Sequence, residues 1–302
     1  QALQRLAAGE RAAYAPFSPP PANRWSAWAA GYGGTETIGG SAIVGSQDLS
    51  ARVAGVAAGA DYRLSPDTLL GFALGGGGLN YSLANAMGTG SADLFQAGVY
   101  GRHRFGPAYV AGALAYGWHD VTTSRTVALA GADQLQGRFK ADTFSARFEG
   151  GYRYATPWVG ITPYAAAHVT SFMLPNYSER SLSGGGLFAL SYAAQTTTDA
   201  RSELGLRTDK SYAMAGGMLT LRGRAAWAHD YSPNRAVTAL FQALPGTAFA
   251  VNGARVDADS ALVSGGAEMS WLNGFSIAAT FDGEFSGNVA SYTGKVAARY
   301  SW

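Results

Sequence analysis

The chain has 302 residues and a formal net charge of +2, and only 14% of its residues are charged, against about 25% in an average soluble protein. Its 22 Lys and Arg residues are scattered along the chain, which argues against nucleic-acid binding. The absence of cysteine excludes disulfides and thiolate metal sites, and no segment approaches the ~18 consecutive apolar residues of a transmembrane helix.

Residues 1–23 differ from the rest of the chain. Apolar residues recur near a helical period over residues 1–15, which predicts one helix. The charges of this helix are Arg5, Glu10 and Arg11. Four prolines between Pro16 and Pro21 then predict a stiff extended spacer. We therefore divide the chain into a helix and linker, residues 1–23, and one all-β domain, residues 24–302.

From residue 24 onward, twelve segments have the length that a tilted transmembrane strand needs. The predicted strands are 24–34, 50–64, 68–81, 92–105, 108–122, 139–155, 158–174, 195–209, 217–231, 260–271, 275–285 and 290–302.

The connections between these segments alternate in length. Short turns rich in Pro, Gly, Asp or Asn are expected at 65–67, 106–107, 156–157, 210–215 and 273–274. Longer polar connections are expected at 35–49, 82–91, 123–138, 175–194 and 232–259, whereas the last one, 286–288, is short. Such alternation is typical of outer-membrane barrels. The sequence therefore predicts a twelve-stranded antiparallel transmembrane β-barrel.

The last strand shows the two faces that such a barrel requires. Apolar and aromatic side chains alternate with polar or small ones, because successive residues of a strand point to opposite sides. The apolar face consists of Tyr292, Val296, Ala298, Tyr300 and Trp302. The chain ends on Trp where many outer-membrane proteins carry Phe, and this resemblance implies that Tyr300 and Trp302 form the signal that the barrel-assembly machinery reads.

The same alternation predicts which charges face the lumen. A Lys or Arg that faced lipid near the middle of the bilayer would cost ~2–4 kcal/mol, so charges should collect on the inner wall. The predicted pore-lining charges are Arg147, Glu149, Arg153, Arg201, Glu203, Arg207, Arg222, Arg224, Glu268, Asp282, Glu284, Lys295 and Arg299. Segments 108–122 and 158–174 alternate poorly, and their faces stay unassigned.

Catalytic and ligand-binding motifs are weak. The four histidines lie on four predicted strands without a metal-ligand spacing, and Asp230 should point away from His229. The glycine runs 75–78 and 184–186 lack the Gly-Lys-Ser/Thr ending of a phosphate loop and indicate strand kinks or loop tips. No catalytic residue, metal or cofactor is predicted. The tryptophans are interpreted as interface anchors: Trp25, Trp28, Trp118, Trp158, Trp227, Trp271 and Trp302.

Several short strings, in this order and with this strand count, resemble the C-terminal translocator (β-domain) of classical autotransporters, the type V secretion proteins. They are GADYR at 59–63, SELGLR at 202–207, AAWAHDY at 225–231 and FDGEF at 281–285. The resemblance implies a monomeric barrel in the Gram-negative outer membrane that anchors and exports an N-terminal passenger. The passenger would be extracellular and the C-terminus periplasmic.

The resemblance further implies that residues 1–15 form a plug in the pore, with charges that meet wall residues such as Glu203, Arg222, Glu268 and Glu284. The expected partners are the passenger, outer-membrane lipid, lipopolysaccharide and the assembly machinery. Because the chain opens without Met or a signal peptide, it is expected to be the C-terminal piece of a longer precursor. Whether the passenger is cleaved inside the pore stays open.

Three alternatives remain. An outer-membrane enzyme, such as an omptin-like protease or a phospholipase, should show an external or bilayer-rim cluster of His with Asp or Ser. A passive porin should lack the plug, and a soluble β-sandwich should have two open sheets.

Overall fold

A computed structural model describes residues 24–302 apart from 42–44, 129–131, 233–235, 245, 247 and 255. The predicted helix, with Arg5, Glu10 and Arg11, therefore lies outside the described residues. No helix within the described part of the chain is long and apolar enough to cross a membrane.

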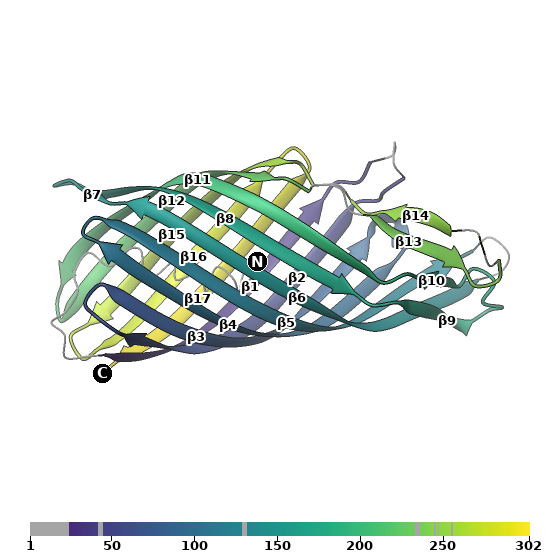
Figure 1. Ribbon diagram of the computed structural model, residues 1–302, viewed down its shortest axis with the longest axis horizontal. Helices are drawn as coiled ribbons and strands as arrows, with labels where there is room; N and C mark the ends of the chain where they lie inside the picture. Colours follow the sequence, from purple (N-terminus) through teal and green to yellow (C-terminus); the bar gives the residue numbers. More distant parts are fainter. Residues whose placement is uncertain are drawn as a thin grey trace.

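Twelve strands of the described chain pair antiparallel with their neighbours and form a closed ring, which confirms the predicted barrel (Figure 1). The pairing of β1 with β17 closes it, from Ser26 opposite Ser301 to Ile38 opposite Val289. The barrel strands are β1 (Trp25–Ile38), β2 (Leu49–Arg63), β3 (Thr68–Leu83), β4 (Thr89–Phe105), β5 (Ala108–Val127), β6 (Asp133–Tyr152), β8 (Gly160–Leu174), β11 (Gln195–Met214), β12 (Gly217–Asp230), β15 (Asp259–Trp271), β16 (Phe275–Phe285) and β17 (Val289–Ser301).

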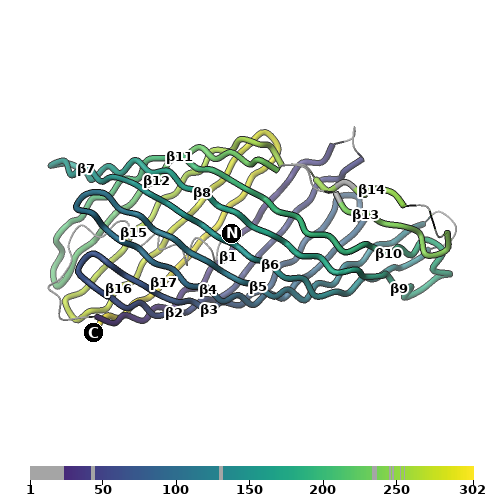
Figure 2. Tube along the Cα trace, viewed as in Figure 1, coloured from purple at the N-terminus to yellow at the C-terminus, as the bar shows by residue number. Residues whose placement is uncertain are grey.

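The two ends of the barrel differ. At the end that holds Trp302, which we call the turn end, short connections join the strands, and the two-residue strand β7 (Tyr154–Ala155) extends the wall. The opposite end, the loop end, carries four further strands (Figures 1 and 2). These strands are β9 (Tyr177–Ser183), β10 (Leu190–Tyr192), β13 (Ala236–Phe241) and β14 (Ala248–Asn252), and we call them the external sheet.

The external sheet corrects the prediction that 123–138, 175–194 and 232–259 are loops. β5 and β6 each run for 20 residues, so they continue past the barrel rim, and β9 pairs with this extension of β6. The extension is held by packing, because Leu135 is only 1% exposed. β9 is polar, and β10, β13 and β14 are only three, six and five residues long, so none of them has the length and alternation that mark a membrane-spanning strand. A short 3-10 helix, η2 (Ala84–Ala86), forms most of the link between β3 and β4.

On the last strand, β17, the outer and inner faces carry the residues that the sequence predicts for them. Tyr292, Val296, Tyr300 and Trp302 are each between 44% and 56% exposed on the outside, whereas Ala297 is 3% exposed on the inside. The structure also assigns the two strands whose faces the sequence leaves open. Tyr109 on β5 and Tyr164 on β8 are both 4% exposed and face inward.

One tryptophan prediction is wrong. Trp28 is 5% exposed and points into the barrel, where its indole nitrogen donates a 2.8 Å hydrogen bond to Tyr100 Oη. Glycines make room for such inward rings. A Cβ on Gly55 would lie 2.4 Å from Tyr32 Oη, so the missing side chain at this position of β2 leaves room for the ring of Tyr32 from β1.

Candidate functional site: the charged lumen

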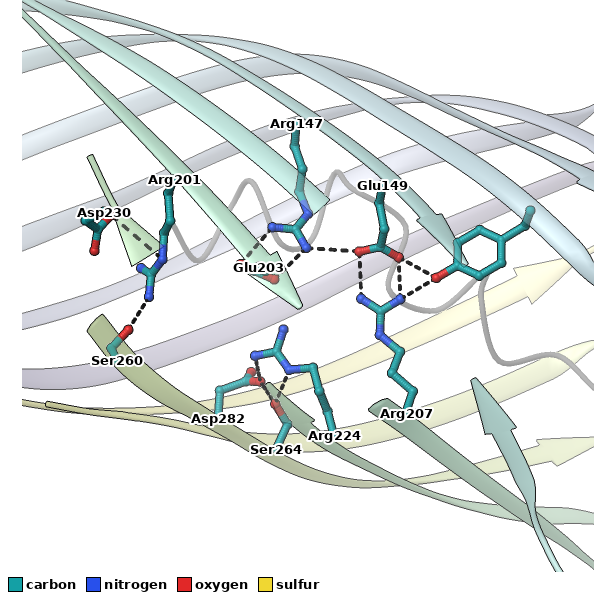
Figure 3. A network of polar contacts seen from close by, with 11 residues as sticks. Arg147, Glu149, Arg201, Glu203, Arg207, Arg224, Asp230, Ser260, Ser264 and Asp282 are labelled. Carbon is teal, nitrogen blue, oxygen red and sulfur yellow. Dashed lines mark hydrogen bonds and ion pairs between the residues drawn. The ribbon is translucent and has the colours of Figure 1, made fainter. Parts of the chain in front are cut away.

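The predicted pore-lining charges lie on inward positions of β6, β11, β12, β15, β16 and β17, with Arg153 in the link after β6. Several ion pairs join strands that are not paired with each other, because these side chains reach over the intervening strands on the inner face of the barrel. Figure 3 labels ten of the residues involved.

The most buried group joins β6 to β11 across β8. Arg147 donates to Glu203 through both terminal nitrogens, at 3.0 and 2.9 Å, and to Glu149 at 2.9 Å (Figure 3). Arg207, which is fully buried, donates a hydrogen bond to each carboxylate oxygen of Glu149, one of them 2.7 Å long. Tyr109 donates to Glu149 at 2.7 Å. This alternation of cations and anions satisfies the buried charges mutually, as burial requires.

Small residues on β8 make this reach possible. Ala166 lies opposite both Glu149 of β6 and Glu203 of β11, so a methyl group separates the two carboxylate rows. Tyr164 lies two residues before Ala166 on β8. The guanidinium carbon of Arg207 lies 3.9 Å from the centre of the Tyr164 ring, in a cation–π contact.

A second group joins β11 to β16. Arg201 donates to Glu284 at 2.6 Å and to Ser260 at 2.7 Å, and its Nε lies 3.8 Å from Asp230. Ser260 donates in turn to Glu284 at 3.1 Å. A third group repeats this arrangement nearby: Arg224 donates to Ser264 at 3.1 Å, and Ser264 donates to Asp282 at 2.5 Å (Figure 3).

A fourth group crosses the closing seam. Asp61 of β2 accepts from Arg299 of β17 at 2.8 Å, from Ser26 of β1 at 3.0 Å, and from Tyr100 of β4. Because Tyr100 also accepts from Trp28, one carboxylate that is 1% exposed ties the first strands of the barrel to the last.

The remaining predicted charges are also on the inner wall. Arg153 binds Asp209 through two nitrogens, at 3.1 and 2.7 Å, near the turn end. Arg222 forms an ion pair with Glu268. Lys295 lines a small cavity of about 50 Å³ together with Arg222, Arg224 and Asp282.

Toward the loop end, the lumen widens into a cavity of about 1310 Å³. Its lining includes lumen charges such as Arg201 and Glu284, and also apolar residues of the external sheet such as Val237 and Val251. The charged lumen therefore communicates with the space enclosed by the external sheet.

The histidines do not gather into a site. His119 contacts Thr143 and His168 contacts Thr170, both on the inner wall, whereas His103 contacts Thr68. Among the described residues, no group of three or more His, Cys, Asp or Glu side chains could hold a metal ion.

His229 makes a contact that is relevant to the enzyme alternative. Its Nδ1 lies 2.8 Å from Asp259 on β15, whereas Asp230 turns inward to Arg201. Ser202 is opposite His229 on the neighbouring strand, but its hydroxyl lies 3.2 Å from Tyr231 Oη. Within the described residues, the His229–Asp259 pair has no hydrogen-bonded serine.

The sequence prediction missed the uncharged and isolated members of these groups. They are Ser26, Trp28, Asp61, Tyr100, Tyr109, Tyr164, Ser260 and Ser264. Strand parity places Asp61 inward once the face of β2 is known, so that signal was available. Tyr109 and Tyr164 lie on the two strands without clear alternation, and the sequence offered no comparable signal for them.

A family model described as the autotransporter β-domain matches residues 27–282. Two curated relatives, both described as extracellular serine proteases of Serratia marcescens, are each 29% identical to the chain. One match covers 78% of the chain and 22% of the relative, and the other covers 65% and 19%. The chain thus spans about a fifth of the length of these relatives.

Two solved translocator structures share the fold. The translocator domain of the autotransporter NalP from Neisseria meningitidis superposes with a TM-score of 0.74 at 15% identity, covering 92% of this chain and 88% of that one. The β-domain of the Bordetella autotransporter BrkA gives a TM-score of 0.70 at 16% identity, with 93% and 100% covered. At these identities the likeness concerns the fold.

Proposed function

The chain belongs to the autotransporter β-domain family of outer-membrane translocators, and on this premise we propose that it anchors an N-terminal passenger and carries it outward through the barrel. The observation that carries this proposal is a closed wall around a charged interior that opens at the loop end into a cavity of about 1310 Å³. A closed ring leaves no unpaired strand edge in lipid, and a charged lumen can hold water and a polar peptide.

The proposed orientation has the turn end in the periplasm and the loop end outside the cell. Outer-membrane barrels have short periplasmic turns and longer external loops, and the connections here are distributed in that way. The passenger would then leave the cavity at the external sheet. Lipid and lipopolysaccharide would contact the exposed apolar belt, in which Val56, Phe148 and Val296 are more than half exposed.

Within this proposal, residues 1–15 form a helical plug. Arg5, Glu10 and Arg11 would face wall charges of opposite sign, such as Glu203, Arg222, Glu268 and Glu284. The mixture of both signs on the wall supports this idea, because a helix with both signs can then find partners. We further propose that the domain works as a monomeric conduit and anchor without a catalytic site of its own.

The proposal is tested by fusing an epitope-tagged reporter to Gln1 and expressing the fusion in a Gram-negative host. The expected result is reporter that an external protease removes from intact cells, while the barrel stays in the membrane fraction. The control fusion lacks β17, so its ring cannot close. Reporter that stays protected inside cells with a correctly folded barrel would contradict the export function.

A further inference from the structure

The external sheet ends in an open edge. Its strand order continues the barrel wall from β6 through β9, β10 and β13 to β14. Within the described part of the chain, β14 pairs with β13 alone, from Leu240 opposite Ala248 to Ala236 opposite Asn252. The other side of β14 therefore presents backbone donors and acceptors that can pair with an additional strand.

This edge lacks the features that normally block such pairing. Exposed edge strands usually carry Lys, Pro or an inward charge. The stretch from Ala236 to Asn252 contains no charged residue, and neither strand contains a proline. Ala248 and Ala250 are exposed, and Phe249 and Val251 are each 36% exposed. A short strand, apolar except for its last residue, thus ends the sheet.

One face of the hairpin borders the exit of the lumen. Val237 and Val251, which are directly opposite each other, line the cavity of about 1310 Å³. On the same parity, Phe241 and Phe249 stack with ring centres 5.2 Å apart, and Ala239 is 1% exposed. A strand added to β14 would place every second side chain against this apolar inner face.

The hairpin is also held firmly at its base. Arg125 of β5 binds Glu179 of β9 through two nitrogens, at 2.8 and 2.7 Å, and Gln242 after β13 donates to the backbone of Glu179 and Leu190. Burial alone would lower the pKa of Arg125, but its hydrogen bonds and charge interaction with Glu179 raise it above the usual value. Gln242 therefore anchors the end of β13, next to the hairpin turn, to β9 and β10.

We propose that β14 is an acceptor edge for the exported passenger: an extended segment of it pairs with β14 as it leaves the lumen, by β-strand addition. This inference rests on the proposed export function. The passenger is the favoured occupant because it must pass the cavity that the hairpin lines, whereas a second copy in the membrane would have no such route. Pairing at the exit would oppose backsliding and would start β-structure outside the cell.

Strand pairing is tested by whether disulfide formation alternates along the passenger segment. Because the chain has no cysteine, Val251→Cys on the inner face and Ala250→Cys on the outer face give unique thiols. Each is placed in a full-length precursor whose passenger carries single cysteines at successive positions and is stalled by a fused folded domain. We expect disulfides at every second passenger position, with opposite parity for the two variants. Leu83→Cys, which lines the same cavity, should show no alternation.

Disulfides without alternation, or disulfides between two copies of the Ala250→Cys chain, would overturn the inference while export continues. A second test measures the rate at which the passenger appears at the cell surface. Ala250→Lys should slow the appearance of passenger at the surface severalfold, because a lysine on the edge blocks pairing, whereas Ala243→Lys, outside the strand, should not. Equal rates would overturn the inference. If no passenger reaches the surface with the unsubstituted chain, the proposed function itself fails.

Discussion

Arg207 illustrates how single residues are stabilised in this barrel. Its side chain is fully buried, yet it bonds Glu149 and Tyr109 and covers the ring of Tyr164. A buried guanidinium without such partners would be strongly unfavourable. The charged lumen is thus a packed structural layer as well as a polar lining.

Arg207→Met is expected to lower the free energy of unfolding by about 3 kcal/mol, because it removes one member of a buried ionic group. Urea unfolding of the refolded barrel in lipid vesicles measures this. The control is Asp67→Asn, which removes an exposed partner 3.4 Å from Arg104 and should cost less than about 1 kcal/mol. Equal losses would contradict the structural role of the buried group.

Adjacent glycines of β3 give a second prediction at this scale. A Cβ on Gly77 would lie 2.5 Å from the carbonyl oxygen of Ala54, whereas a Cβ on Gly78 would meet nothing within 4 Å. Gly77→Ala should therefore destabilise the barrel by roughly 1–3 kcal/mol. Gly78→Ala should be neutral, or stabilising by less than about 1 kcal/mol. The same unfolding measurement decides, and a similar effect of the two substitutions would refute the packing argument.

Among the elements, the closing strand β17 has two separable roles. It pairs with β1 along thirteen residue pairs and with β16 on its other side, which closes the ring. Beyond the strand, Trp302 exchanges two backbone hydrogen bonds with Trp25, at 3.2 and 3.0 Å, while its side chain stays 52% exposed. The backbone therefore serves closure, and the exposed indole is available for recognition.

We propose that Trp302 is part of an aromatic assembly signal, and on that proposal Trp302→Ala is expected to reduce the amount of assembled barrel in cells severalfold. Assembly is measured by the altered gel mobility of the folded barrel. Trp158→Ala is the matched control, since Trp158 lies at the same end and is 81% exposed. In purified form, the Trp302→Ala barrel should refold as well as the parent. A refolding defect of the same size would mean that Trp302 acts through stability instead.

For the whole molecule, the proposed plug makes a prediction about conductance. Deletion of residues 1–15 should raise the single-channel conductance of the purified protein in planar bilayers, because the proposed plug would exclude ions from the lumen. Replacing Arg5, Glu10 and Arg11 together by Gln should raise the frequency of open events without changing the size of the full opening. Unchanged conductance after the deletion would count against the plug.

The sequence alone determined the barrel because the membrane imposes a local rule. Each spanning strand needs a lipid-facing apolar side and a separate polar side, and this rule repeats every second residue. Faces were therefore assigned on six of the twelve predicted strands, which placed residues such as Arg147, Glu203 and Arg224 on the inner wall, and were left open on two. The exceptions, β5 and β8, carry small or aromatic residues on both faces, so their alternation is weak.

Only the tertiary structure decided which charges meet and how the chain is arranged beyond the membrane. The partners Arg201 and Glu284 are separated by 83 residues, and closure of the ring, not spacing in sequence, brings them within 2.6 Å. The same applies to Asp61, Trp28 and Tyr100, which meet at the seam. Outside the bilayer a strand does not need a lipid-facing apolar side, so the short strands of the external sheet could not be distinguished from loops by sequence. Only their pairing in the structure identified them as strands.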